Sequence, residues 1–162
     1  MGKWALLAAT LVLAVPAVAA GMPARLALGY SFVSYLGEGG NTPRAAFLAL
    51  SGKGTLTLEL DLGWQRGPTT RVSMDTYTAA AGPKISFATE GRARPFVHVL
   101  FGLRHAELDD AGLAAAGWVA GGGFDIGAGR VRVRLGADFQ AFGLPFAWFG
   151  GSTARLGVGL AF

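Results

Sequence analysis

The chain has 162 residues, a formal net charge of +4, no cysteine and 26 glycines, and only 15% of its residues are charged. A typical soluble domain has about 25% charged residues, so this chain is unusually apolar. The absence of cysteine excludes disulfides and thiolate metal sites. The sequence has no basic run of the kind that binds nucleic acid. After residue 20 it also lacks the roughly 20 unbroken apolar residues of a membrane helix.

Residues 1–20 have the pattern of a cleavable export signal. A positive MGK precedes the apolar WALLAATLVLAV and the small-residue segment PAVAA, which are the three parts of a secretory signal peptide. We expect cleavage after Ala19 or Ala20 and a single domain over 21–162; a retained membrane anchor is the alternative. With no cysteine to carry a lipid, the mature protein is expected to be a non-lipidated protein of a bacterial envelope.

The rest of the chain has strand periodicity. Residues 55–66 are the clearest case, because Leu56, Leu58, Leu60 and Leu62 alternate with polar residues and glycine. Most of the predicted strands are close to the length of about 9–11 residues that a tilted strand needs to cross a bilayer. Their regular spacing predicts an antiparallel meander of eight strands, over 25–36, 44–51, 55–66, 73–87, 94–105, 116–126, 130–141 and 153–162.

The predicted connections alternate in length. Those at 51–54, 88–93 and 127–129 are short, and those at 37–43, 67–72, 106–115 and 142–152 are generally longer. Short turns at one end and long loops at the other are typical of outer-membrane barrels.

Within each predicted strand, the charged residues fall on the same set of alternate positions, which we call one parity and which corresponds to one face of the sheet. This arrangement favours a barrel that is polar inside and apolar outside. The charged residues comprise four acids and five bases in addition to a histidine, and near-balanced ions suit a narrow interior in which each ion needs a partner. Glycines on the same parity leave room for them. We expect Glu59 and Asp61 to pair with Arg132, Arg134 or Arg155. The predicted luminal network is Glu59, Asp61, Lys84, His98, Arg104, Asp125, Arg132, Arg134, Asp138 and Arg155.

The opposite parity is apolar and predicts a lipid-facing wall. Trp64 and Trp118 are expected at the loop ends of their strands, and Phe87 and Phe162 at the turn ends, forming two interfacial aromatic girdles. The alternating Leu156, Val158, Leu160 and terminal Phe162 resemble the signal that marks outer-membrane barrels for their assembly machinery.

Four segments carry a family resemblance: Ala81-Gly82-Pro83-Lys84, Arg94 to His98, Gly121 to Asp125, and Arg155 to Phe162. Through them the chain resembles the small OmpA/OmpX-type barrels of the outer membrane protein β-barrel domain family, over essentially its whole mature length. The resemblance implies an all-β, eight-stranded antiparallel up-and-down transmembrane β-barrel in the outer membrane of a Gram-negative-type envelope. We expect outer-membrane lipid and lipopolysaccharide around it, and the barrel assembly machinery and periplasmic chaperones as partners during biogenesis.

The two histidines do not form a recognisable catalytic motif. Lipid A deacylases carry a histidine and a serine two residues apart, and neither His98 nor His105 has this neighbour. Ser73 and Asp75 could approach His105, as a palmitoyltransferase would need, but no local motif supports it. His105, Glu107, Asp109 and Asp110 fit a solvated acidic loop, with a weak divalent-cation site as the alternative. The sequence predicts no catalytic residue, no metal and no cofactor.

One predicted outer loop, 142–152, is rich in aromatic residues. Phe142, Phe146, Trp148 and Phe149 are too apolar for a free aqueous loop. They are expected to fold onto the membrane interface, or alternatively to form a docking site for a partner or a hydrophobic ligand.

The sequence thus predicts a non-enzymatic integral outer-membrane barrel with a largely plugged lumen and a structural or surface-interaction role. The main alternative is a narrow channel or carrier for small or hydrophobic molecules. A lipid A-modifying enzyme and a soluble lipocalin-like binder with the opposite polarity are further alternatives. The sequence does not identify the surface partner.

Overall fold

The computed structural model of the chain describes residues 24–35, 44–68, 73–88, 90–108, 111–143 and 152–162. The predicted export signal at 1–20 lies outside these residues. The described part forms eight strands: β1 (Ala24–Tyr35), β2 (Arg44–Gly52), β3 (Leu56–Pro68), β4 (Ser73–Ser86), β5 (Ala93–Leu108), β6 (Ala111–Ile126), β7 (Arg132–Gly143) and β8 (Ser152–Ala161).

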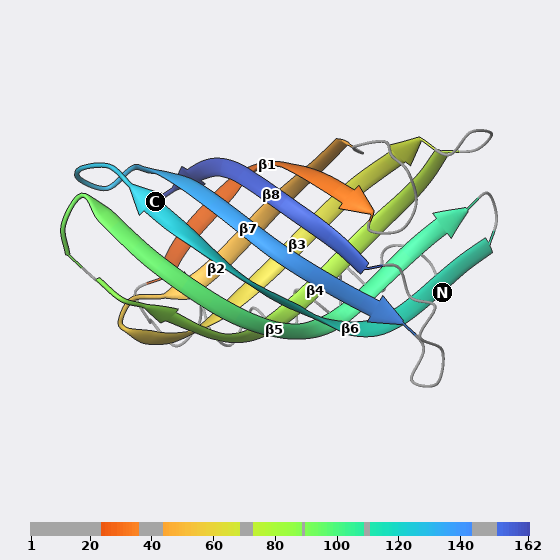
Figure 1. Cartoon of the computed structure of the whole chain (residues 1–162), viewed down its shortest axis with the longest axis horizontal. Helices are drawn as coiled ribbons and strands as arrows, with labels where there is room; N and C mark the ends of the chain where they lie inside the picture. Colours follow the sequence, from red (N-terminus) through yellow and green to blue (C-terminus); the bar gives the residue numbers. More distant parts are fainter. Residues whose placement is uncertain (1–23, 36–43, 69–72, 89, 109–110, 144–151) are drawn as a thin grey trace.

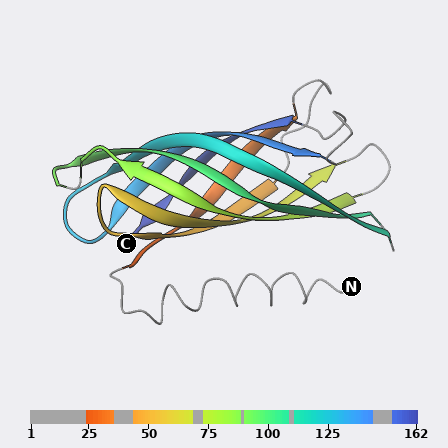
Figure 2. The same ribbon diagram turned by 90° about the horizontal axis from the view of Figure 1, so that it is seen from below.

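Each strand pairs antiparallel with the next, and β8 pairs with β1, so the sheet closes into a barrel. Figures 1 and 2 show the tilted strands wrapped around one axis in two perpendicular views. The predicted eight-stranded up-and-down barrel is therefore confirmed. In the described part of the chain, no helix is long and apolar enough to cross a membrane.

The side chains alternate between the two faces of the wall. On β7, Arg132 and Arg134 are buried, whereas Val133 and Leu135, which alternate with them, are exposed. On β3, Glu59 is only 1% exposed while its neighbour Leu58 is 76% exposed. The barrel is thus polar inside and apolar outside, the inverse of a soluble protein. Among the described outward side chains of the strands, the charged residues and the histidine all lie at the end opposite the short turns: Arg66, Asp75, His105 and Glu107.

We call the two ends of the barrel the turn end and the loop end. The turn end contains the connections 53–55, 87–92 and 127–131, together with the start of β1 and the end of β8. Two of these turns touch, because the backbone N–H of Gly127 donates to the carbonyl oxygen of Arg92 at 2.8 Å. Gly127 and Gly129 adopt positive φ angles of 150° and 79°, which glycine tolerates best.

The predicted loop at 106–115 is wrong. Most of it is strand, because β5 runs to Leu108 and β6 begins at Ala111, with their paired registers extending to these residues. Residues 111–117 are mostly alanine and glycine, so the sequence shows no alternation of polar and apolar residues in this segment. The backbone pairing of β5 and β6 nevertheless continues through it. Consequently Trp118 lies in the middle of β6, and the prediction that it ends its strand is also wrong.

Inward glycines allow the wall to curve tightly. A Cβ at Gly123 would overlap the carbonyl oxygen of Leu135 on the neighbouring strand. Its register partner Gly136 has more space, since a Cβ there would meet only the carbonyl oxygen of Gly122, at 3.7 Å. Gly123 is therefore required for close approach of β6 and β7, whereas Gly136 is not.

Candidate functional site: the luminal charge network

The structure places all ten residues of the predicted luminal network on the inward parity. Arg104 and Asp138 are partly exposed. The other eight are buried: Glu59, Asp61, Lys84, His98, Asp125, Arg132, Arg134 and Arg155.

Glu59 is the centre of one half of the network. Its Oε2 accepts from Lys84 Nζ at 2.6 Å and from Arg134 Nη1 at 3.4 Å, and its Oε1 lies 2.6 Å from His98 Nδ1. Arg134 also donates to both carboxylate oxygens of Asp125, at 2.7 and 3.0 Å. The carboxylate of Glu59 on β3 therefore joins β4, β5 and β7 across the lumen.

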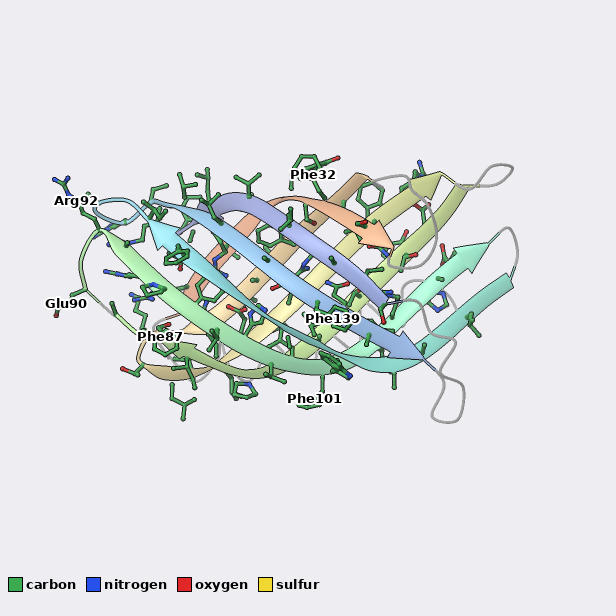
Figure 3. All side chains as sticks on the ribbon, in the orientation of Figure 1. Phe32, Phe87, Glu90, Arg92, Phe101 and Phe139 are labelled. Carbon is green, nitrogen blue, oxygen red and sulfur yellow. The ribbon has the colours of Figure 1, made fainter. Side chains whose placement is uncertain are left out.

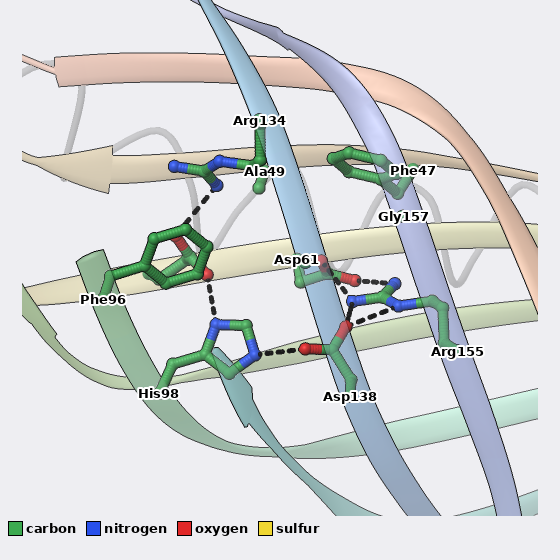
Figure 4. Close-up of a pocket in the computed structure, with 11 residues that line it drawn as sticks. Phe47, Ala49, Asp61, Phe96, His98, Arg134, Asp138, Arg155 and Gly157 are labelled. Carbon is green, nitrogen blue, oxygen red and sulfur yellow. Dashed lines mark hydrogen bonds and ion pairs between the residues drawn. The ribbon is translucent and has the colours of Figure 1, made fainter. Parts of the chain in front are cut away.

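Arg155 is the centre of the other half. It donates to both oxygens of Asp61, at 2.9 Å each, and to Asp138 through Nε at 2.7 Å. His98 links the halves, because its Nε2 lies 2.9 Å from Asp138 Oδ1. Figure 4 shows His98, Asp138, Arg155 and Asp61 as one connected line. An ionised carboxylate can only accept, so a ring held between two of them fits the doubly protonated imidazolium.

With His98 protonated, the eight residues joined by these bonds are electrically balanced. Their four carboxylates face Lys84, His98, Arg134 and Arg155, each of which contacts at least one of them. Phe96 packs under two of the cations, with Lys84 Nζ 4.2 Å and Arg134 Cζ 4.7 Å from its ring centroid. A cavity between the network side chains has a volume of about 20 Å³, enough for about one water molecule.

A second layer closes the lumen toward the loop end. Leu100, Val119 and Phe142 point inward from β5, β6 and β7 and pack with Ala80. Arg104 lies over the Phe142 ring at 4.3 Å and donates to Gln140 Oε1 at 2.7 Å. This apolar layer was not predicted, and it corrects one sequence assignment. Phe142 is 3% exposed inside β7 and is not part of an outer docking loop; Phe146, Trp148 and Phe149 lie outside the described residues.

Two luminal arginines were missed by the sequence analysis. Arg25 has the parity of buried Ala27, and Arg94 has the parity of Phe96 and His98. Both lie at the turn end. There Arg25 is close enough to be repelled by Arg94, Arg132 and Arg134 and attracted by Asp125. The positions of Arg25 and Arg94 on the inward parity of their strands were the signal in the sequence that could have identified them as luminal. Their inclusion adds to the excess of positive charge that Arg104 and Arg132 already give the lumen.

The remaining predicted groups face outward. His105 and Glu107 are 3.6 Å apart on the outer wall of β5, and Asp75 is held by Arg66 through bonds of 2.9 and 2.7 Å. Asp109 and Asp110 lie outside the described residues. Across the described ranges, no group of three or more histidine, aspartate or glutamate side chains could hold a metal ion.

The aromatic and C-terminal residues lie on the outer wall. Trp64, Trp118, Phe87 and Phe162 are exposed, as are Leu156, Val158 and Leu160. Trp118 packs on Phe139 with ring centroids 5.4 Å apart. The backbone N–H of Phe162 donates to the carbonyl oxygen of Leu26 at 2.8 Å, so this residue contributes to barrel closure between β8 and β1.

No protein-family model matches the chain, and no curated protein matches its sequence. Solved structures match its fold. Neisserial surface protein A is 14% identical with a TM-score of 0.69, covering 85% of this chain and 94% of that one. Ail, the attachment invasion locus protein of Yersinia pestis, is 14% identical with a TM-score of 0.56, covering 86% and 97%. The outer membrane enzyme PagL is 14% identical with a TM-score of 0.55, covering 85% and 98%.

These matches establish the fold as that of the small eight-stranded outer-membrane barrels, in agreement with the resemblance in the sequence. The matching proteins include an attachment invasion locus protein and an enzyme. The fold alone therefore does not decide the activity, which must be argued from the residues of this chain.

Proposed function

We propose that the protein is a non-enzymatic integral outer-membrane barrel with a closed lumen, whose role is structural or depends on contacts made by its outer surface. The observation that carries the proposal is the cross-lumen network. Asp61 and Glu59 on β3 are tied to Arg155 on β8 and Arg134 on β7, so the interior is filled by ions that bind one another.

The outer wall supports insertion in a membrane. Large apolar side chains cover it, including Leu58, Phe101 and Leu156, each at least 60% exposed. In water such a belt would be a large unpartnered apolar surface. In lipid it is the expected wall of a barrel, and we assign the surrounding partners accordingly to outer-membrane lipid and lipopolysaccharide.

The positions of the histidines support a non-enzymatic role. Both ring nitrogens of His98 contact carboxylates inside the filled lumen, so this residue has no ring nitrogen left to act as a base on a substrate. His105 faces outward beside Glu107, while Asp75 is engaged by Arg66. A mass spectrum of lipid A from cells with and without the protein tests this point, and a change in its acyl chains would contradict the proposal.

Conductance across planar bilayers tests the closed lumen. Barrels shown to be folded by heat-modifiable gel mobility are reconstituted, and insertion is verified by protease protection. We expect no stable open state, because two layers obstruct the interior. A reproducible open state of the inserted protein would favour the alternative, a narrow channel or carrier.

A further inference from the structure

The turn end of the lumen contains three arginines, Arg25, Arg94 and Arg132, that form no ion pair with the luminal carboxylates. The four carboxylates of the lumen are already bound to Lys84, His98, Arg134 and Arg155. Asp125, the acid nearest this end, uses both of its oxygens for Arg134. Among the described residues, no carboxylate pairs with Arg25, Arg94 or Arg132 at hydrogen-bond distance.

The strand registers place these arginines on adjoining strands. Arg94 on β5 is the register partner of Asp125 on β6, which is the partner of Arg134 on β7. Arg132 follows two positions closer to the turn end and is aligned with Ala161 on β8. Arg25 on β1 lies close enough to be repelled by the charges of Arg94 and Arg132, and the carboxylate of Asp125 offsets only part of this repulsion. All three side chains project to the inside of the same mouth.

Two of these guanidinium groups have donors with no acceptor. The Nε atoms of Arg94 and Arg132 are buried and make no hydrogen bond, and the whole Arg132 residue is only 8% exposed. Arg132 is nevertheless held in place, because its Nη1 donates to the carbonyl oxygen of Gly91 at 3.0 Å. Buried donors without acceptors cost free energy, and an oriented guanidinium is suited to an anion with several oxygens.

We propose that Arg25, Arg94 and Arg132 form a binding site for a phosphate-class oxyanion at the turn-end mouth of the barrel. Three guanidinium groups match the charge and the several acceptor oxygens of such an ion. The ion enters from the aqueous side, because the arginines are on the inner wall while Phe87, Val131 and Phe162 face the surrounding lipid. Arg25 and Arg94 are only partly buried, so the mouth is open to it.

Titration of the folded full-length barrel with inorganic phosphate tests the site. The protein is held in neutral-detergent micelles at constant ionic strength set with chloride, and binding is followed by calorimetry and by ³¹P line broadening. We expect saturable binding of one phosphate per barrel. The double variant R94Q/R132Q should weaken it by at least about tenfold, the loss expected when charge-assisted hydrogen bonds are removed.

Arg130→Gln is the matched control, since Arg130 lies at the same end but is exposed on the rim. It should change the affinity by less than about twofold, because it alters only the screened surface charge. If the double variant does not show heat-modifiable folding, the single variants R25Q and R94K replace it, and each should weaken binding several-fold. No saturable binding to the wild-type protein, or an equal loss in R130Q, would overturn the proposal.

A second experiment distinguishes binding of a dissolved anion from binding of a lipid headgroup. Phosphate titration is repeated in nanodiscs made with anionic phosphatidylglycerol and in nanodiscs made with phosphatidylcholine alone. A site for a dissolved oxyanion should bind phosphate in both. If phosphatidylglycerol abolishes phosphate binding at matched bulk ionic strength, the site takes a lipid phosphate and the proposed aqueous ligand is wrong.

Discussion

Arg155 on β8 binds Asp61 on β3 through two parallel hydrogen bonds of 2.9 Å, although the two residues are 94 positions apart in sequence. Both side chains are buried, at 7% and 4% exposure. A paired ion in such a place is not a large source of stability by itself, but a lone one is costly.

The first prediction is that Arg155→Met lowers the free energy of unfolding by about 3–5 kcal/mol, because Asp61 would be left charged and without its cation. Urea unfolding in lipid vesicles measures it. The control is Arg66→Met, which breaks a bidentate pair with Asp75 at the exposed loop end and should barely move the urea midpoint. Equal effects of the two variants would contradict a buried network.

The second prediction concerns the two acids of β3. Replacing Glu59 and Asp61 together with leucine removes half of the luminal carboxylates and leaves Lys84 and Arg155 with too few partners. We expect loss of the heat-modifiable folded form. Glu107→Leu removes a carboxylate from the outer wall and should fold normally. Unchanged folding of the double variant would show that the luminal acids are dispensable.

The third prediction compares two glycines on the same register row. Gly123→Ala should destabilise the barrel by about 1–3 kcal/mol, because its methyl group meets the backbone of Leu135. Gly136→Ala, whose Cβ has ordinary van der Waals distance to Gly122, should change stability by less than about 1 kcal/mol. Urea midpoints of the two proteins provide the comparison. Destabilisation by Gly136→Ala but not by Gly123→Ala would contradict the close approach of β6 and β7 at Gly123.

The fourth prediction tests the apolar layer. Phe142→Ala should cost about 3–5 kcal/mol, because it empties the space between Leu100 and Val119 inside the wall. Phe139→Ala removes an aromatic ring from the outer face of the same strand, where lipid refills the space, and should cost clearly less. An equal cost measured by urea unfolding would contradict the inward position of Phe142.

The fold could be predicted from the sequence where polarity alternates strictly. Leu56 to Leu62 placed β3 within two residues at each end, because each polar neighbour is inward and each leucine outward. The same signal was absent from 111–117, where alanine and glycine suit both faces. The extension of the predicted strands 94–105 and 116–126 into a longer β5–β6 hairpin was therefore missed. Phe142 was assigned to a loop because it begins an aromatic segment, although it retains the inward parity of Gln140.

The network could be predicted as a set of residues but not as a set of pairs. Parity assigns Glu59 and Asp61 to the lumen, and it left three arginines as possible partners. Which cation reaches which acid depends on the tilt of the strands and on how they meet across the barrel. The structure resolves this by giving Asp61 to Arg155 and Glu59 to Lys84, His98 and Arg134.

The central claim is that the apolar face of this barrel lies against lipid and its charges lie inside. Cell fractionation combined with gel mobility before and after boiling tests it most directly. We predict that the protein is recovered in the outer-membrane fraction and that boiling shifts its mobility, as the closed sheet unfolds. Recovery in the aqueous periplasmic fraction, with the same mobility before and after boiling, would contradict the claim.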